Sequence, residues 1–224
     1  MARSMCEQLN PHLDFLLSSV YDRSGLHPEH LADLRKSGLS DGTITMQKIR
    51  TIPPHMIDHL LGFEAPKVRH AYLIPFADPR GGWMNHVRMK IFPTITTENG
   101  TTKYLQPRRS GARLFFPLAT LERVLQGDKP LWVIEGEKKA LAVAQLGFPA
   151  VGFEGIEGWH AAGARDLAAD FAFIPLKDRV VEFVPDGDVA TNPHVERGAA
   201  RLARALEHAD ARVRLVRLPA QLVA

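Results

Sequence analysis

Three acidic residues of this sequence follow directly after two strongly apolar segments. Glu135 comes after LWVI, and Asp186 and Asp188 come after RVVEFVP. If both segments are parallel strands, their carboxyl ends bring the three acids to one edge of a sheet. Carboxylates gathered in this way raise one another's pKa and destabilise the fold unless a cation compensates them. Because all the ligands are hard oxygens, we predict a site for Mg²⁺ (or Mn²⁺) made by Glu135, Asp186 and Asp188.

The spacing of the acids strengthens this prediction. Asp186 and Asp188 are separated by one glycine, so a turn can present both carboxylates to one site. An isolated Asp-Gly-Asp is usually an ordinary turn, because short motifs have many false positives. Here it is combined with Glu135-Gly136 at a second strand end, 51 residues earlier. The combination favours a functional site over a structural turn.

The elements around these acids alternate between apolar runs and amphipathic helices. LWVI and RVVEFVP are typical of buried parallel strands, and EKKALAVAQLG and HVERGAARLARALEHA are typical of helices. PAVGF follows the first of these helices and RVRLVRLP follows the second, and both are expected to be strands. Strand and helix in alternation indicate a doubly wound α/β domain over residues 119–224.

The preceding residues have a different character. Residues 1–66 are expected to be mainly helical, from the spacing of LDFLLSSVY and from prolines placed before apolar-periodic runs. Residues 67–118 contain partly alternating runs separated by DPRGG and TENGTT, which predicts an antiparallel meander that includes RLFFPL. The predicted fold is therefore an α/β sheet of Rossmann type, preceded by a helical segment and a β-rich subdomain.

Positive charge is concentrated in the β-rich part. From Pro66 to Arg113 there are nine basic residues and two acids, a net charge of +7 in a chain whose total is +3. Such a local field suits a polyanion, because neutralised phosphates release counterions; a solvated loop region with surface charge is the alternative. Lys138 and Lys139 follow Glu135, where at least one of them is expected to contact a substrate phosphate; a solvated helix face is the alternative. The candidate nucleic-acid-binding residues are Arg88, Lys90, Lys103, Arg108, Arg109, Arg113, Lys138 and Lys139.

Several other functions are disfavoured by composition. The single cysteine, Cys6, excludes a disulfide framework and a cysteine-based zinc site. No run of about 18 apolar residues is present, so we expect a cytoplasmic protein without a membrane partner. His55 and His59 are four residues apart, but no acid completes a metal motif with them. No role is assigned to these histidines or to His27, His30 and His70.

The ordered motifs resemble the Toprim domain of bacterial DnaG-type primases, topoisomerases and some nucleases. The segment from LWVIEGEKK to AVGF is similar to the first family motif, and RVVEFVPDGD is similar to the second. Upstream, LIPFADPRGGWMNHVRMK, KYLQP and RLFF resemble the basic strands of the primase polymerase core. The resemblance implies a Toprim-like fold, the metal-binding role of the three acids, and a template groove lined by Arg88, Lys103, Tyr104 and Leu105. It is closest to Toprim-like replication proteins of phages, plasmids and integrated elements.

Three features depart from the primase pattern. Lys139 stands where the family motif has an aspartate, four residues after the glutamate. No further acidic motif follows RLPAQLVA, and the cysteine-rich zinc-binding segment of bacterial primases is missing from the sequence. The resemblance as a whole still implies primer synthesis on a single-stranded DNA or RNA template, with nucleotides as substrates and a helicase or other replication protein as partner, whereas these departures favour a non-catalytic module. Glu135 would be a metal ligand or the general base. A Toprim nuclease and a non-catalytic binding module remain the alternatives.

Overall fold

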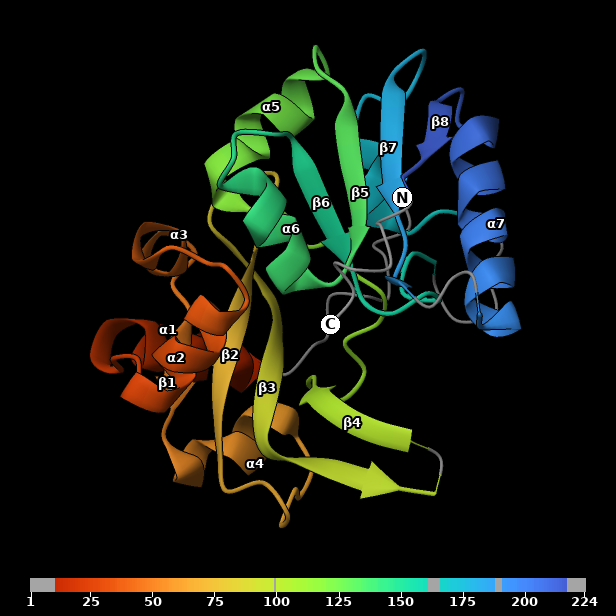
Figure 1. Ribbon diagram of the computed structural model, residues 1–224. Helices are drawn as coiled ribbons and strands as arrows, with labels where there is room; N and C mark the ends of the chain where they lie inside the picture. Colours follow the sequence, from red (N-terminus) through yellow and green to blue (C-terminus); the bar gives the residue numbers. More distant parts are fainter. Residues whose placement is uncertain (1–10, 99, 161–165, 188–190, 217–224) are drawn as a thin grey trace. The chain divides into compact units, whose positions relative to one another are not determined.

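A computed structural model describes residues 11–98, 100–160, 166–187 and 191–216 (Figure 1). The chain forms two compact units. The first contains residues 1–36, 44–76 and 83–110, and the second contains residues 37–43, 77–82 and 111–224. The sequence patterns divide the chain into three segments, with boundaries at residues 66 and 118. This division stays a prediction.

The first unit is built on an antiparallel sheet with the strand order β1-β2-β3-β4. Its strands are β1 (Arg50–Ile52), β2 (His70–Ala77), β3 (Trp83–Thr97) and β4 (Gly100–Leu105). The helices that belong to or enter this unit are α1 (Pro11–Arg23), α2 (Pro28–Lys36), α3 (Asp41–Met46), η1 (Pro54–Met56) and α4 (Ile57–Leu61). The register between β3 and β4 shifts between Lys90 and Ile95, which marks an irregularity in the long strand β3.

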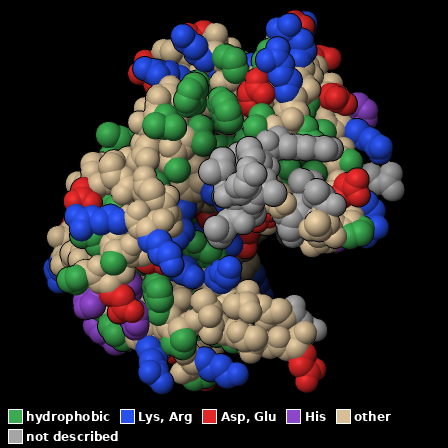
Figure 2. Space-filling model, in the orientation of Figure 1, with side chains coloured by type: hydrophobic (Ala, Val, Ile, Leu, Met, Phe, Trp, Pro, Cys, Tyr) green, Lys and Arg blue, Asp and Glu red, His purple; other side chains and the backbone are tan. Residues whose placement is uncertain are grey.

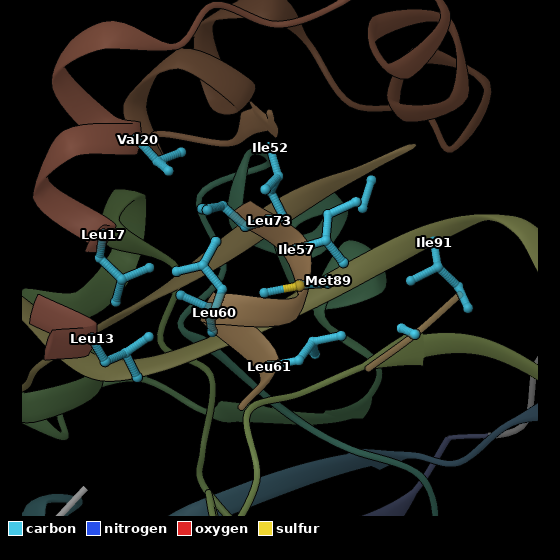
Figure 3. Close-up of a cluster of buried hydrophobic side chains, with 13 residues drawn as sticks. Leu13, Leu17, Val20, Ile52, Ile57, Leu60, Leu61, Leu73, Met89 and Ile91 are labelled. Atoms are coloured by element: carbon cyan, nitrogen blue, oxygen red, sulfur yellow. The ribbon is translucent and has the colours of Figure 1, made fainter. Parts of the chain in front are cut away.

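Alternation along β3 explains how this unit divides apolar from polar side chains. Val87, Met89 and Ile91 lie on one face of the strand and join the core. Leucines at one face of α1 and the apolar residues of α4 pack against them (Figure 3). The intervening residues Arg88 and Lys90 therefore lie on the opposite face of the sheet.

The second unit is built on a parallel sheet with the strand order β6-β5-β7-β8. Its strands are β5 (Leu131–Glu135), β6 (Ala150–Phe153), β7 (Val180–Val184) and β8 (Arg212–Leu215). Its helices are η2 (Leu118–Thr120), α5 (Leu121–Gln126), α6 (Glu137–Ala144), η3 (Ala169–Phe173) and α7 (Pro193–His208). Helix α6 packs on β5 and β6, and α7 packs on β8. Since β5 connects to β6 on one side and β7 connects to β8 on the other, right-handed crossovers place α6 and α7 on opposite faces.

One local prediction was wrong. RLFFPL forms no strand of the antiparallel sheet: within it, Phe115 makes an isolated antiparallel bridge to Gly152 of β6, with both N···O distances at 2.8 Å. This segment therefore belongs to the second unit. The expected helical segment also contains β1, a strand of three residues whose pairing with β2 depends on tertiary contacts and leaves no periodic signal. Among the described residues, no helix has the length and apolar composition needed to cross a bilayer.

Candidate metal centre and nucleic-acid interface

The structure places Glu135 and Asp186 at neighbouring strand ends. Strands β5 and β7 pair in parallel with Ile134 opposite Val184, so the residues that follow both strands emerge at the same edge. The connections after β5 and β7 run to opposite sides of the sheet. This reversal of strand order is the position at which open α/β sheets carry their functional groups.

Gly136 sets the direction of the chain between Glu135 and α6. Its φ of 100° and ψ of 138° lie in a region that residues with a Cβ rarely adopt. Gly152 on β6 permits close packing beside it, because a Cβ there would lie 3.1 Å from the Ala140 Cβ. The backbone conformation therefore explains why a glycine follows Glu135 in the motif.

Three charged side chains converge at this edge. Glu135 is only 9% exposed, and its Oε2 lies 3.4 Å from the backbone N–H of Asp186, which donates to it. The Lys139 Nζ, in the first turn of α6 and four residues after Glu135 in the sequence, donates to the Asp186 Oδ1. Both members of this ion pair are open to solvent, with side chains 53% and 40% exposed. A buried carboxylate, an exposed carboxylate and an ammonium group therefore form one connected cluster.

The donor set of this cluster fits a hard divalent cation. Glu135 and Asp186 supply carboxylate oxygens, and Mg²⁺ is commonly bound by one or two carboxylates with water completing the shell. The Lys139 ammonium already compensates Asp186, which shows that this carboxylate attracts a cation. The third predicted ligand, Asp188, lies outside the described residues. Within the described ranges, no three His, Cys, Asp or Glu residues form a group able to hold a metal ion.

The basic residues of β3 are held on the polar face of the antiparallel sheet. Arg88 and Lys90 are 9% and 8% exposed. Their charged groups lie 5.3 Å and 5.2 Å from the ring centroid of Tyr104 on β4, and the Lys90 Nζ is also 5.3 Å from the Phe92 ring. Their two-residue spacing places them on one face of β3, where both are buried and packed on aromatic rings.

The other candidate cations lie in different surroundings. Lys103 is exposed on β4, and Arg108 and Arg109 are exposed in the turn that follows this strand. Arg113 belongs to the second unit, where its Nε donates to Asp170 Oδ2 at 2.9 Å. Lys138 is half-buried in the first turn of α6. On the face shown in Figure 2, Lys and Arg side chains lie in several separate groups.

Sequence reasoning did not select Glu157, which organises a second charged cluster. Its carboxylate lies 2.9 Å from His160 Nε2 and also pairs with Arg201 of α7. Burial raises the pKa of Glu157, but the hydrogen bond to His160 and the charge of Arg201 outweigh burial and hold it below its ordinary value. Trp159, in the same segment, is 2% exposed and part of the core. Glu157 was missed because its partner Arg201 is 44 residues away in the sequence, and such a pairing leaves no local signal.

Comparison with known proteins supports the fold of both units. A model of the family described as "Domain of unknown function (DUF3854)" matches residues 121–222, which contain the parallel sheet. Among curated proteins, no sequence matches the chain significantly. The zinc-binding and RNA polymerase domains of the Aquifex aeolicus primase are similar over 97% of this chain, with 15% identity and a TM-score of 0.66. The chain spans 58% of that structure.

Two other solved structures give the same result. The RNA polymerase domain of Mycobacterium tuberculosis primase DnaG is 14% identical over 97% of this chain and 76% of its own length, with a TM-score of 0.62. A DnaG primase catalytic domain bound to single-stranded DNA is 20% identical over 94% of this chain and 75% of its own length, with a TM-score of 0.56. The predicted α/β, Toprim-like fold is thereby confirmed, and its structural neighbours are DnaG primase catalytic cores.

Proposed function

We propose that this chain is a primase-type nucleic-acid domain, which uses Mg²⁺ (or Mn²⁺) held by Glu135, Asp186 and Asp188 to add nucleotides to a strand on a single-stranded template. The observation that carries the proposal is the meeting of Glu135 and Asp186 at the point where the parallel sheet reverses its strand order. Primase cores with the same fold support this class of chemistry over others that an α/β sheet can host.

The residues of the chain would divide the work as follows. A bound divalent cation supplies stabilisation of the charge that develops on the transferring phosphoryl group. Asp186, exposed at the strand end, is placed to be a ligand. Glu135 is buried and fixed through the backbone N–H of Asp186, so it is positioned either to complete the ligand set or to accept the proton of the attacking hydroxyl.

Nucleic-acid binding is assigned to the basic residues predicted from the sequence. Lys103, Arg108 and Arg109 are exposed and suited to phosphates, while Arg88 and Lys90 place charge beside the Tyr104 ring. Lys138 and Lys139 would serve the substrate phosphates near the acids. Arg113 contributes least in this proposal, because Asp170 already pairs with it. The similar catalytic domain bound to single-stranded DNA supports a single-stranded partner.

A second candidate, a non-catalytic binding module with the same fold, is favoured by one observation. Lys139 places a positive charge directly on Asp186, and this charge opposes a metal at that carboxylate. A Toprim nuclease would use the same acids to activate water. A role in the replication of mobile elements and a helicase partner belong to the proposal as well.

One assay separates these functions. The chain is incubated with a single-stranded template, labelled nucleotides and Mg²⁺ or Mn²⁺. Longer products are expected; shortened strands would show a nuclease, and binding without product would show a module. Glu135→Gln keeps an oxygen that can accept from the Asp186 N–H but removes the charge, and it should lower the activity at least about a hundredfold.

The matched control for this variant is Glu182→Gln. Glu182 lies on β7, where its carboxylate pairs with Arg214 at 3.2 Å, away from the carboxyl ends of the strands. Removing this charge should leave the product yield within about twofold of the wild-type yield, because Glu182 pairs with Arg214 and not with the acid cluster. Equal loss in both variants would contradict the assigned role of Glu135.

A further inference from the structure

The ion pair between Lys139 and Asp186 joins an amphipathic helix to a strand end 47 residues away in the sequence. Helix α6 begins directly after Gly136 and directs Lys139 toward the loop that follows β7. The same Asp186 is connected through its backbone N–H to Glu135. A positive charge is thus built into the cluster that is proposed to bind a divalent cation.

We infer that Lys139 is an internal counter-cation of Asp186, which a divalent metal ion displaces, and that the freed ammonium group then binds a phosphate of the substrate. This inference rests on the proposed metal site. It adds that metal binding and phosphate binding are coupled through one lysine side chain.

Solvent exposure makes the displacement feasible. The two side chains are 53% and 40% exposed, and exposed pairs of this kind typically shift an equilibrium by no more than about fivefold. A divalent ion carries twice the charge of the ammonium group and gains the Glu135 carboxylate in addition. The divalent ion should therefore displace the Lys139 ammonium group from Asp186.

The length and flexibility of lysine suit the second half of the inference. The side chain has a four-carbon stem, and its ammonium group is a compact point charge that can be redirected without a change in the helix. Once released, it belongs to the first turn of α6, four residues after Glu135 in the sequence, and would be within reach of the metal-bound phosphate that nucleotidyl transfer requires. Metal binding would then raise the affinity of the chain for a phosphate-bearing ligand.

The test is calorimetric titration of the full chain with Mg²⁺, alone and in the presence of a short oligothymidylate. Lys139→Met removes the charge and keeps most of the stem, so Mg²⁺ affinity should rise by about threefold to fivefold, the most that an exposed pair of this kind can withhold. Lys129→Met is the matched control, because Lys129 is an exposed lysine just before the amino end of β5. The control should change the Mg²⁺ affinity by less than twofold.

A double-mutant cycle with Asp186→Asn locates the effect. The gain from Lys139→Met should disappear when Asp186 is already neutral, because the competition no longer exists. In the second titration, Mg²⁺ should strengthen oligothymidylate binding by the wild-type chain several-fold more than by Lys139→Met. Circular dichroism of each variant checks that the fold is retained.

The outcomes separate this inference from the proposed function. If Asp186→Asn binds Mg²⁺ as the wild-type chain does, the metal site itself is wrong. If Asp186→Asn weakens Mg²⁺ binding but Lys139→Met leaves it unchanged, only the competition is overturned. If Lys139→Met gains metal affinity without losing the coupling to oligothymidylate, the phosphate role of Lys139 is overturned.

Discussion

The carboxyl edge of the parallel sheet and the polar face of the antiparallel sheet hold their charges in different ways. At the carboxyl edge, Lys139 and Asp186 neutralise each other in solvent. On the polar face, Lys90 and Arg88 are nine-tenths buried and packed on Tyr104. An exposed pair can exchange its partner at little cost, whereas a buried cation on aromatic rings is fixed in place.

The carboxyl edge is therefore suited to the exchange of ligands, and the polar face is suited to holding side chains in fixed positions. The carboxyl edge has a defined backbone and one exchangeable ion pair, because Gly136 and the β5–β7 register set the course of the chain while the side chains of Lys139 and Asp186 remain exposed. The polar face owes its order to side-chain packing, which includes the stacked rings of His70 and Phe92 at 5.0 Å. Perturbing the backbone should damage the first region most, and perturbing buried side chains should damage the second.

The largest effect is expected from Gly136→Ala. The backbone at φ 100° would force a Cβ into a strained conformation, which costs about 3 kcal/mol of stability or shifts Glu135 away from Asp186. Urea denaturation and Mg²⁺ titration would measure the two consequences. Gly42→Ala, in α3 and without a positive φ, is the control and should not destabilise the chain. A Gly136→Ala variant with unchanged stability and metal affinity would contradict the defined backbone assigned to this edge.

The second largest effect concerns His30 on the polar face. His30 is 1% exposed, with Nδ1 at 2.7 Å from Thr51 Oγ1 and Nε2 at 2.8 Å from His70 Nδ1. Burial, with smaller contributions from His70 and His27, lowers the pKa of His30 to about 4, and the carboxylates of Glu29 and Asp33 only partly oppose this.

The sign of the pH dependence follows from this shift. Between about pH 6.5 and pH 4 the unfolded chain takes up a proton on residue 30 that the folded chain does not, so stability is lost as the pH falls through this window. Urea denaturation should show that the wild-type chain loses about 2 kcal/mol more than His30→Gln between pH 7 and pH 5. The exposed His55→Gln variant should lose as much as the wild type. Equal losses in all three chains would refute the assignment to His30.

The sequence predicted the carboxyl edge better than the polar face. Apolar runs followed by Glu135-Gly136 and by Asp186 predict the parallel strands and their shared edge, because burial on both faces and the glycine turn are local properties. The functional roles of the acids stay predictions, and Asp188 lies outside the described residues.

The rest depended on contacts that sequence patterns do not encode. His30 meets His70 across 40 residues, and Lys139 meets Asp186 across 47. The burial of Arg88 and Lys90 was missed because two-residue spacing gives the face of a strand but not what covers that face. Strand β1 was missed because three residues are too short for a periodic pattern.

The smallest effects are expected for the exposed arginines of the first unit, and they compare exposed with buried cations directly. Arg108→Gln and Arg109→Gln should each lower the slope of log affinity against log salt for a single strand by about 0.7 to 0.9, because each loses one phosphate contact. Their stability should be unchanged, since both side chains are exposed. Arg88→Met should in addition lower the free energy of unfolding by about 1 kcal/mol, because it removes the guanidinium group from the Tyr104 ring. Lys36→Gln, an exposed lysine at the end of α2, controls for general loss of charge and should leave the slope unchanged. An equal slope for Lys36→Gln and the two arginine variants would mean that the net charge of the chain, rather than these positions, attracts the strand.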